Sequence, residues 1–281
     1  MAQIQLLADS GATKAEWCLL KGTKKKILFT QGISPYFMNT EQIVKMLNEE
    51  LKPHLKREQI DVIHYYGTGC SNPDNIKSIR KALKQVFTTT SKIHVDHDLM
   101  GAARALCKNQ KGIACILGTG SNSCYFNGKK IVKNSPGLGY VLGDEGSGAY
   151  LGRKVLQHFL YNSFDEELMA RFNARFKTNQ IEILDKVYRQ PLPNRYMASF
   201  AVFLSENRGH YMIENMLEDS FNDFFFNHLY KYKESWLYPI NFVGGVAFGF
   251  KDVLKSLCEL YGLQLGTVMK HPMEGLIAYH R

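Results

Sequence analysis

The chain has 281 residues, of which 45% are hydrophobic and 22% are charged, and its formal net charge is +9 at pH 7. This length allows two ordinary domains, and no run of about 18 uncharged apolar residues suggests a membrane span. The first residues do not form a signal peptide, and the six scattered cysteines lack metal-type spacing, so we expect a cytoplasmic protein with reduced thiols. The lysine clusters are short and turn-like, which argues against a nucleic-acid partner and leaves an anionic small molecule such as a nucleotide.

The first half of the chain predicts a strand–strand–strand start followed by alternating helices and strands. Residues 6–32 read as strand, tight glycine turn, strand, lysine-bearing turn and strand. Asn39 has the position of an N-cap, with Gln42 three residues later. The further elements expected in this half are a helix at 39–53, a strand at 61–69, a helix at 74–87, a strand at 92–98 and a helix at 99–108.

The second half repeats this order around an insertion. Residues 114–136 resemble residues 6–32, with Gly120 in the place of Gly11. The elements expected next are a helix at 145–162, a helix-rich insertion at about 164–236, a strand ending at Gly244–Gly245, a helix at 250–261, a strand at 263–269 and a final helix from 271.

An internal repeat of this kind specifies architecture. Two βββαβαβα units in tandem predict an α/β protein with two mixed sheets, and a ligand held between the glycine turns of both halves. We place the first domain at residues 1–107 and the second at residues 108–281, with the helical insertion inside the second.

The two glycine turns predict phosphate binding. Residues 9–14 and 118–122 each place hydroxyl side chains beside a glycine turn, where backbone N–H groups can approach a phosphate without obstruction. Hairpin turns favour Gly, Ser and Asn regardless of function, but recurrence in both halves favours a common ligand. Asp9 ends an apolar strand, so we expect it to hold a hydrated Mg²⁺, with capping of the turn as the alternative.

Asp98 is the candidate catalytic base. It ends the predicted strand at 92–98 just before a helix, and the carboxyl ends of strands are where α/β sheets hold ligands. An aspartate there can accept a hydroxyl proton during phosphoryl transfer, and the equally open alternative is N-capping of the helix. His94 and Asp96 share a face of the same strand, but nothing completes a zinc-type ligand set.

Two more glycine-rich segments follow. Asp144 and Glu145 lie among three glycines at a helix start, where capping is the simple explanation and close approach of a ligand is the preferred one. Gly244 and Gly245 end a short apolar strand and suit either a tight turn or the floor of an adenine site. No P-loop or complete dinucleotide fingerprint occurs in the sequence.

Taken together, five segments resemble the BadF/BadG/BcrA/BcrD ATPase family, and most of all its N-acetylglucosamine kinase members. They are residues 8–14 (ADSGATK), 98–102 (DLMGA), 116–123 (ILGTGSNS), 137–148 (GLGYVLGDEGSG) and 242–250 (FVGGVAFGF). The resemblance implies the two-lobed actin-like ATPase fold, which is ribonuclease H-like, and an ATP-dependent kinase that phosphorylates an amino sugar at its 6-hydroxyl, with ATP and Mg²⁺ as cofactors.

The resemblance also implies roles for single residues. Asp98 would be the catalytic base acting on the sugar. The residues implied to bind the nucleotide are Asp9, Gly11, Thr13, Lys14, Gly118, Thr119, Gly120, Ser121, Gly244 and Gly245, with Asp9 also positioning Mg²⁺ through water. The residues implied to contact the sugar are Asn39, Asn122, Gly137, Asp144 and Gly148.

Alternatives remain open on the sequence alone. Leu138 stands where the better-known kinases carry Trp, which leaves glucosamine, another amino sugar or an unrelated acceptor in play. A nucleotide-switched activator of the same family is the second hypothesis, and Cys115 and Cys124 do not sit where its iron–sulfur chemistry would expect them. A third is hydrolysis of a polyphosphate, with Glu145 positioning water. A homodimer is the first candidate for the oligomeric state.

Overall fold

The computed structural model describes residues 3–11, 14–55 and 58–281. The described residues form two compact units: unit 1 runs up to Asn109 and also contains His271–Arg281, and unit 2 is Gln110–Lys270. The predicted domain boundary at 107/108 lies two residues from the observed one. The prediction that the final helix belongs to the second domain is wrong, because that helix packs within unit 1.

The sheet of unit 1 has five strands in the order β3-β2-β1-β4-β5. The central strand β1 pairs with β2 in antiparallel register and with β4 in parallel register, and β5 extends the parallel side. The carboxyl ends of β1, β4 and β5 therefore meet at one edge. The strands are β1 (Ile4–Ser10), β2 (Lys14–Lys21), β3 (Lys24–Gln31), β4 (Val62–Gly67) and β5 (Lys92–His97).

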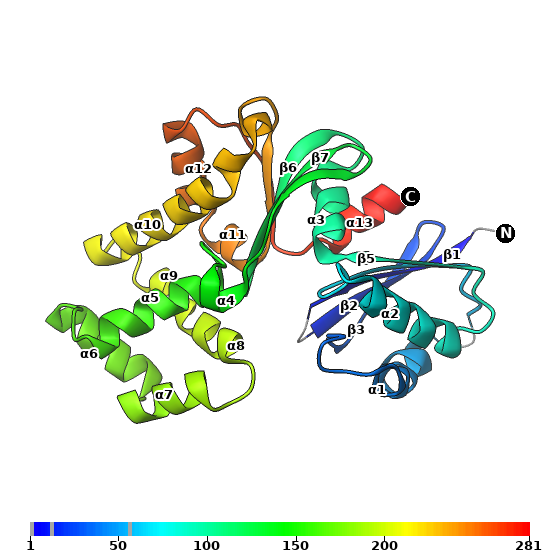
Figure 1. The fold of residues 1–281 in the computed structure, drawn as a ribbon, viewed down its shortest axis with the longest axis horizontal. Coiled ribbons are helices and arrows are strands. Elements are labelled where there is room, and N and C mark those ends of the chain that lie inside the picture. The colour runs from blue at the N-terminus through cyan, green and yellow to red at the C-terminus, as the bar shows by residue number, and fades with distance from the viewer. Residues whose placement is uncertain (1–2, 12–13, 56–57) are drawn as a thin grey trace. The chain divides into compact units, whose positions relative to one another are not determined.

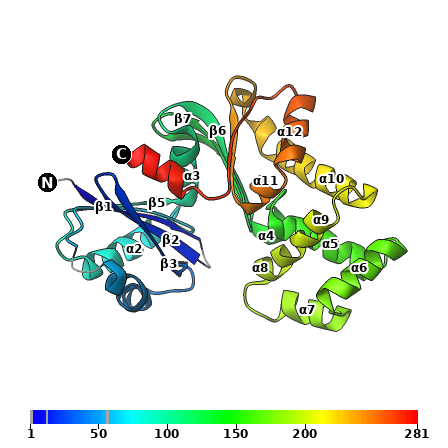
Figure 2. The same ribbon diagram turned by 180° about the vertical axis from the view of Figure 1, so that it is seen from behind.

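Helices cover both faces of this sheet. Figures 1 and 2 show α1 and α2 on one side and α3 and α13 on the other. The helices are α1 (Thr40–Met46), which continues through a π-type turn (Leu47–Leu51) and a 3-10 turn (Lys52–Leu55), α2 (Pro73–Val86), α3 (Asp98–Cys107) and α13 (Met273–His280).

Side-chain alternation along the strands explains why both faces are covered. Leu6, Ala8 and Ile63 belong to the core under α1 and α2, whereas Leu7 belongs to a second core on the opposite face. That second core is completed by α13, which contributes Met273, Leu276 and Ile277. Successive residues of a strand point to opposite faces, so a sheet with apolar residues on both needs a helical layer on each.

The sheet of unit 2 repeats the topology of the first. Its order, β10-β9-β6-β7-β8, is that of unit 1 when β6 takes the place of β1 and β9 the place of β4. The pairing is again antiparallel for β6–β7–β8 and parallel for β6–β9–β10. The strands are β6 (Lys111–Leu117), β7 (Ser121–Asn127), β8 (Ile131–Ser135), β9 (Ile240–Val243) and β10 (Leu265–Met269). The predicted α/β fold of two mixed sheets is therefore confirmed.

The insertion of unit 2 is helical, as predicted. The helices of the unit are α4 (Gly139–Leu142), α5 (Gly148–Leu160), α6 (Glu166–Phe176), α7 (Gln180–Tyr188), α8 (Pro193–Ala198), α9 (Val202–Glu206), α10 (Tyr211–Asn227), α11 (Gly245–Gly249) and α12 (Lys251–Leu260), with 3-10 turns at Ser199–Ala201, Leu229–Lys231 and Lys233–Trp236. The short helix α11 replaces the turn expected after Gly245.

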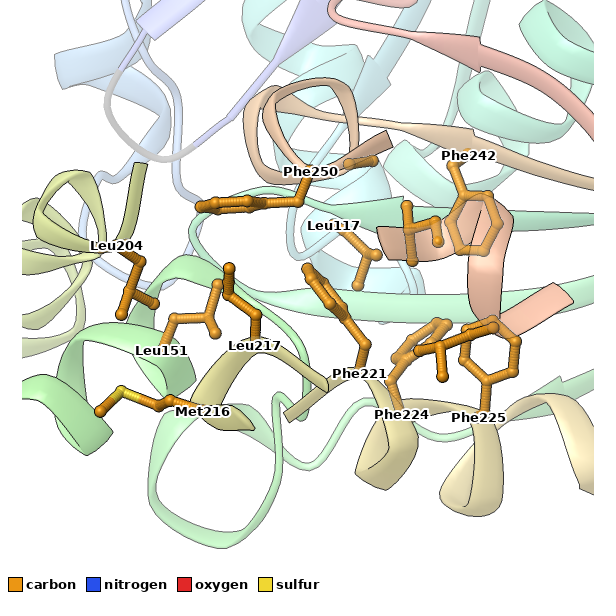
Figure 3. Close-up of a cluster of buried hydrophobic side chains, with 14 of the residues drawn as sticks. Leu117, Leu151, Leu204, Met216, Leu217, Phe221, Phe224, Phe225, Phe242 and Phe250 are labelled. Atoms are coloured by element: carbon orange, nitrogen blue, oxygen red, sulfur yellow. The ribbon is translucent and has the colours of Figure 1, made fainter. Parts of the chain in front are cut away.

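Phenylalanine side chains of α10 fill the core between the insertion and the second sheet. Figure 3 shows Phe221 and Phe224 of α10 among Leu117 at the end of β6, Phe242 of β9 and Phe250. The ring centroids of Phe224 and Phe242 are 6.3 Å apart. Because Leu117 directly precedes the turn at Gly118, this core fixes the base of the predicted phosphate turn. Over the residues described, no helix is long and apolar enough to span a membrane.

Candidate functional site

The carboxyl edge of the first sheet carries Asp9 and Asp98. The parallel register pairs Ser10 with Gly67, and Gly67 with His97, so the ends of β1, β4 and β5 lie level. Asp9 is one residue from the end of β1, and Asp98 follows β5 directly as the first residue of α3. The structure therefore brings these two predicted residues to the same edge.

The carboxyl groups at this edge influence one another. Burial, then the charges of Asp98 and Glu16, raise the pKa of Asp9 to about 7. Glu16 is the cross-strand neighbour of Asp9 in the β1–β2 ladder. Burial also raises the pKa of Asp98, against the opposing effect of the Leu99 N–H, which donates to Asp98 Oδ1 at 2.8 Å. A buried group of like charges is costly to ionise, and it favours a bound proton or cation.

The start of α3 shows which residue caps this helix, and so bears on whether Asp98 is the N-cap or a candidate catalytic base. Strand β5 ends at His97, and His97 is the N-cap: its Nδ1 accepts a hydrogen bond from the Met100 N–H at 3.3 Å. The prediction that Asp98 ends the strand is wrong by one residue, because the chain enters the helix at Asp98. Since His97 caps the helix, the capping alternative does not explain why an aspartate stands at position 98.

The other predicted site residues of unit 1 have contacts of their own, apart from the carboxyl groups of Asp9 and Asp98. The Gly11 N–H donates to the Lys14 carbonyl at 3.1 Å, which closes the first turn, and Thr13 lies outside the described residues. The Lys14 ammonium lies 3.8 Å from the centroid of the Phe29 ring. Asn39 is exposed and caps α1 in a complete capping box, as its spacing from Gln42 predicted.

The second predicted phosphate turn is held open by its neighbours in unit 2. The first amides of α5, those of Gly148 and Ala149, donate to the carbonyls of Gly118 and Thr119 at 2.8 and 3.0 Å. Among the residues described, no hydrogen bond uses the N–H groups of Thr119 and Gly120, and the buried Ser121 Oγ has no partner. A buried hydroxyl is normally paired, so Ser121 Oγ, together with the N–H groups of the exposed Thr119 and the half-buried Gly120, offers hydrogen bonds to an anion.

The Asp144 side chain contacts the turn at Gly118–Ser121. Its backbone is left-handed, with φ of 59°, and its Oδ1 accepts a hydrogen bond from the Ser121 N–H at 3.3 Å. A β-carbon at Gly120 would lie 3.0 Å from Asp144 Oδ2, so a larger residue there would require the Asp144 side chain to shift. Burial raises the pKa of Asp144, and the Ser121 N–H opposes the rise.

Gly244 brings the end of β9 against the same turn. A β-carbon at Gly244 would lie 2.1 Å from the Leu117 carbonyl oxygen, and the residue has φ of 133°. Only glycine fits both the contact and the backbone conformation. Gly245, by contrast, starts α11 with open space beside it.

The predicted sugar-contacting residues of unit 2 lie next to one another. A β-carbon at Gly137 would lie 3.2 Å from the Ser121 carbonyl oxygen and 3.6 Å from Asn122 Cγ. Asn122 Oδ1 accepts hydrogen bonds from the Ser123 N–H at 2.9 Å and from Asn134 Nδ2 at 3.0 Å. Thus Asn122, Gly137 and Asp144 all lie next to Ser121, and their contact with a sugar stays a prediction.

Glu145 belongs to a buried polar network that the sequence did not reveal. Its carboxylate lies 3.5 Å from His228 Nε2, and His228 Nδ1 lies 3.1 Å from Ser123 Oγ. Tyr232 completes the network through Ser123, at 2.9 Å between hydroxyl oxygens. Burial lowers the pKa of His228. Ser123 and His228 are 105 positions apart, so no local pattern could have indicated their contact.

Comparison with known proteins agrees with the motifs. The sequence model of the BadF/BadG/BcrA/BcrD ATPase family matches residues 8–208. A solved structure from Porphyromonas gingivalis, described as a candidate N-acetylglucosamine kinase, is 39% identical, with a TM-score of 0.94 over 98% of each chain.

Two further solved structures share the fold at low identity. A candidate N-acetylglucosamine kinase from Chromobacterium violaceum is 15% identical, with a TM-score of 0.75 over 100% of this chain and 99% of that one. A ROK family glucokinase from Streptomyces griseus, solved with glucose and AMPPNP, is 15% identical, with a TM-score of 0.54 over 98% and 97% of the two chains. With the family match over most of its length and a 39% identical relative along nearly all of it, this chain belongs to the BadF/BadG/BcrA/BcrD ATPase family.

Proposed function

We propose that this protein is an ATP-dependent kinase of an amino sugar, with the 6-hydroxyl of N-acetylglucosamine as the acceptor. The observation that carries the proposal is the position of Asp98 at the carboxyl edge of the first sheet, beside Asp9 and free of the capping role that His97 performs. The name of the 39% identical relative supports the choice of substrate.

Asp98 is suited to accept a proton from a sugar hydroxyl. Burial raises the pKa of its carboxyl group, which strengthens it as a base at neutral pH. Its Oδ1 is held by the Leu99 N–H, so the carboxylate has a fixed orientation at the start of α3. Phosphoryl transfer depends mainly on positioning and charge stabilisation, and a fixed carboxylate orients the attacking oxygen.

The turn at Gly118–Ser121 is suited to hold phosphates. The unused N–H groups of Thr119 and Gly120 and the unpartnered Ser121 hydroxyl are the donors that phosphate oxygens need. Gly244, which packs against this turn, and Gly245 would lie under the adenosine, with open space beside Gly245.

The residues at the edge of unit 1 fit a hydrated Mg²⁺. Burial, and then the charges of Asp98 and Glu16, raise the pKa of Asp9, and a divalent cation would relieve the repulsion among these carboxylates. The described residues include no group of three or more His, Cys, Asp or Glu placed to ligate a metal directly. Asp9 would therefore hold Mg²⁺ through water, and the ion, when bound, neutralises phosphate charge.

In unit 2, the residues that would contact the acceptor are Asn122, Gly137, Asp144 and Gly148. For Asn39, in unit 1, contact with the sugar stays a prediction from the family resemblance. Leu138, at the position of the family's Trp, is 56% exposed and available to contact an acyl group.

Two observations disfavour the rival functions. Glu145 accepts a hydrogen bond from Asn227 Nδ2 at 3.3 Å and its other oxygen lies 3.5 Å from His228 Nε2, so both carboxylate oxygens already have a protein partner, which disfavours a role in positioning a hydrolytic water. Cys115 and Cys124, in β6 and β7, are fully buried, which does not suit a bridging cluster.

The test measures ADP release from MgATP with and without a panel of acceptors. The panel comprises N-acetylglucosamine, glucosamine, N-acetylmannosamine and glucose, and ³¹P NMR of the product identifies the phosphorylated hydroxyl. We expect ADP release to require N-acetylglucosamine and the product to be its 6-phosphate. Slow ADP release that none of the sugars accelerates would favour the activator hypothesis and reject the kinase.

A further inference from the structure

Tyr65 carries a buried hydroxyl that the reaction described above does not use. The residue lies in β4, is fully buried, and packs with its ring centroid 6.1 Å from that of Trp17. Its ring runs along the strand over Gly67. A β-carbon at Gly67 would lie 2.4 Å from Tyr65 Cε1 and 2.6 Å from its hydroxyl oxygen. Gly67 is therefore needed to let the tyrosine reach the carboxyl edge of the sheet.

The hydroxyl at the end of this path makes no close hydrogen bond to the residues described, although the Ser10 hydroxyl is near enough to lower its pKa. An unpaired buried hydroxyl destabilises a folded protein, and phenylalanine would fill the same space without that penalty. Packing alone therefore does not account for a tyrosine at position 65.

Ser10 is the polar group next to this hydroxyl. The parallel register places Ser10 beside Gly67, at the point that the Tyr65 hydroxyl reaches. Ser10 Oγ accepts a hydrogen bond from the Ile33 N–H at 3.1 Å, and Ser10 leads directly into the turn at Gly11. Burial, with smaller contributions from the charges of Asp9 and Asp98, raises the pKa of Tyr65, and the Ser10 hydroxyl opposes that rise. The tyrosine therefore stays protonated and can act as a donor.

We propose that Tyr65 is a positioning residue for nucleotide binding: in the nucleotide-bound protein its hydroxyl donates to Ser10 Oγ and holds the end of β1 at Ser10 and Gly11 in place. This inference rests on the proposed function, since it requires a bound nucleotide. Tyr65 does not touch the reacting atoms. It acts through Ser10. Its hydroxyl lowers the stability of the free protein, and in the nucleotide-bound protein the same hydroxyl holds Ser10 in place.

The test compares Tyr65→Phe with Tyr261→Phe, a control in unit 2 whose hydroxyl donates to Asn222 Oδ1 at 2.6 Å. Measured quantities are the thermal midpoint without ligand, the dissociation constant of MgADP by calorimetry, and kcat and KM for MgATP. We expect Tyr65→Phe to unfold at the same or a higher temperature than the unmodified protein. We also expect it to bind MgADP about tenfold more weakly, the usual effect of losing one hydrogen bond in a charged site.

A double-mutant cycle with Ser10→Ala identifies the partner. If Tyr65 acts through Ser10, Tyr65→Phe should change MgADP binding less than twofold in the Ser10→Ala background. An equal effect in both backgrounds would overturn the assignment to Ser10. MgADP binding by Tyr65→Phe within twofold of the unmodified protein, or a lower thermal midpoint without ligand, would overturn the inference. If the unmodified protein binds no MgADP, the proposed function fails as well, so the two failures are distinguishable.

Discussion

Substitution of Asp98 by asparagine should separate catalysis from stability. Asparagine keeps the shape of the side chain and an oxygen that can accept the Leu99 N–H bond, so α3 should begin in the same way. It cannot take up a proton from a hydroxyl. Loss of general base catalysis typically reduces turnover by about 10²–10⁴-fold, and we expect a reduction in that range with MgADP binding retained.

The same substitution should stabilise the free protein. Moving the pKa of Asp9 from 3.8 to about 7 corresponds to about 4 kcal/mol of unfavourable free energy for the ionised form in the folded state. Burial is the largest cause and the charge of Asp98 the second, so removing that charge should return less than half, about 1 kcal/mol. For units of this size, that gain is about 2–4 °C in the thermal midpoint.

The pH dependence has a definite sign. A carboxyl group whose pKa is raised in the folded state binds its proton more tightly there than in the unfolded chain. The contribution of Asp9 to stability is therefore lost as the pH rises from about 4 to about 7, and Asp98→Asn should make this loss smaller.

Thermal unfolding between pH 4 and 8 and a coupled assay of ADP release measure both effects. Asp96→Asn is the matched control, because Asp96 accepts an ion-paired hydrogen bond from Arg104 at 3.1 Å and should lose stability rather than gain it. Turnover of Asp98→Asn within tenfold of the unmodified protein would remove Asp98 from the chemistry. A lower thermal midpoint at pH 8 would show that the electrostatic reasoning is wrong.

Three further predictions concern other parts of the molecule. Ser121→Ala should unfold at an unchanged or higher temperature, because it removes an unpaired buried hydroxyl, yet calorimetry should show weaker MgADP binding. Gly244→Ala should cost more than about 3 kcal/mol in chemical denaturation because of its clash and its φ, whereas Gly245→Ala, with open space, should cost less than about 1 kcal/mol. Burial lowers the pKa of His64 to about 4 and that of His280 to about 3, so at these two positions the unfolded chain binds more protons below pH 6.5. Their contribution to stability is lost as the pH falls from 6.5 to 4, opposite in sign to that of Asp9, so the thermal midpoint of His280→Gln should rise relative to that of the unmodified protein over this range.

Local patterns predicted the elements that depend on neighbouring residues. The glycine turns, the capping box at Asn39 and the repeated order of strands are properties of short segments, and the duplicated sheets follow from them. The repeat also indicated that Gly118 and Gly244 follow strands of one sheet, and they lie against each other because the ends of neighbouring parallel strands meet at one edge.

Contacts between distant segments could not be read in this way. The cap of α3 went to His97 rather than Asp98, since a histidine nitrogen can also accept a backbone N–H bond. The turn of Glu145 toward His228, and the path of the Tyr65 ring over Gly67, depend on how side chains fill space in the folded protein. The sequence assigned α13 to the second domain. A repeat predicts the order of the elements, but it does not predict that the last helix packs on the core of unit 1.

The membership of α13 in unit 1 has a consequence for how the chain folds during synthesis. Unit 2 is one continuous stretch, Gln110–Lys270, and can bury its core as soon as that stretch is available. One face of the first sheet, with Leu7 and Leu20, is covered only in part, by α3, until Met273–His280 leaves the ribosome. The unit that begins first at the ribosome is thus the one that is completed last, and until then it presents an apolar face that a chaperone can bind.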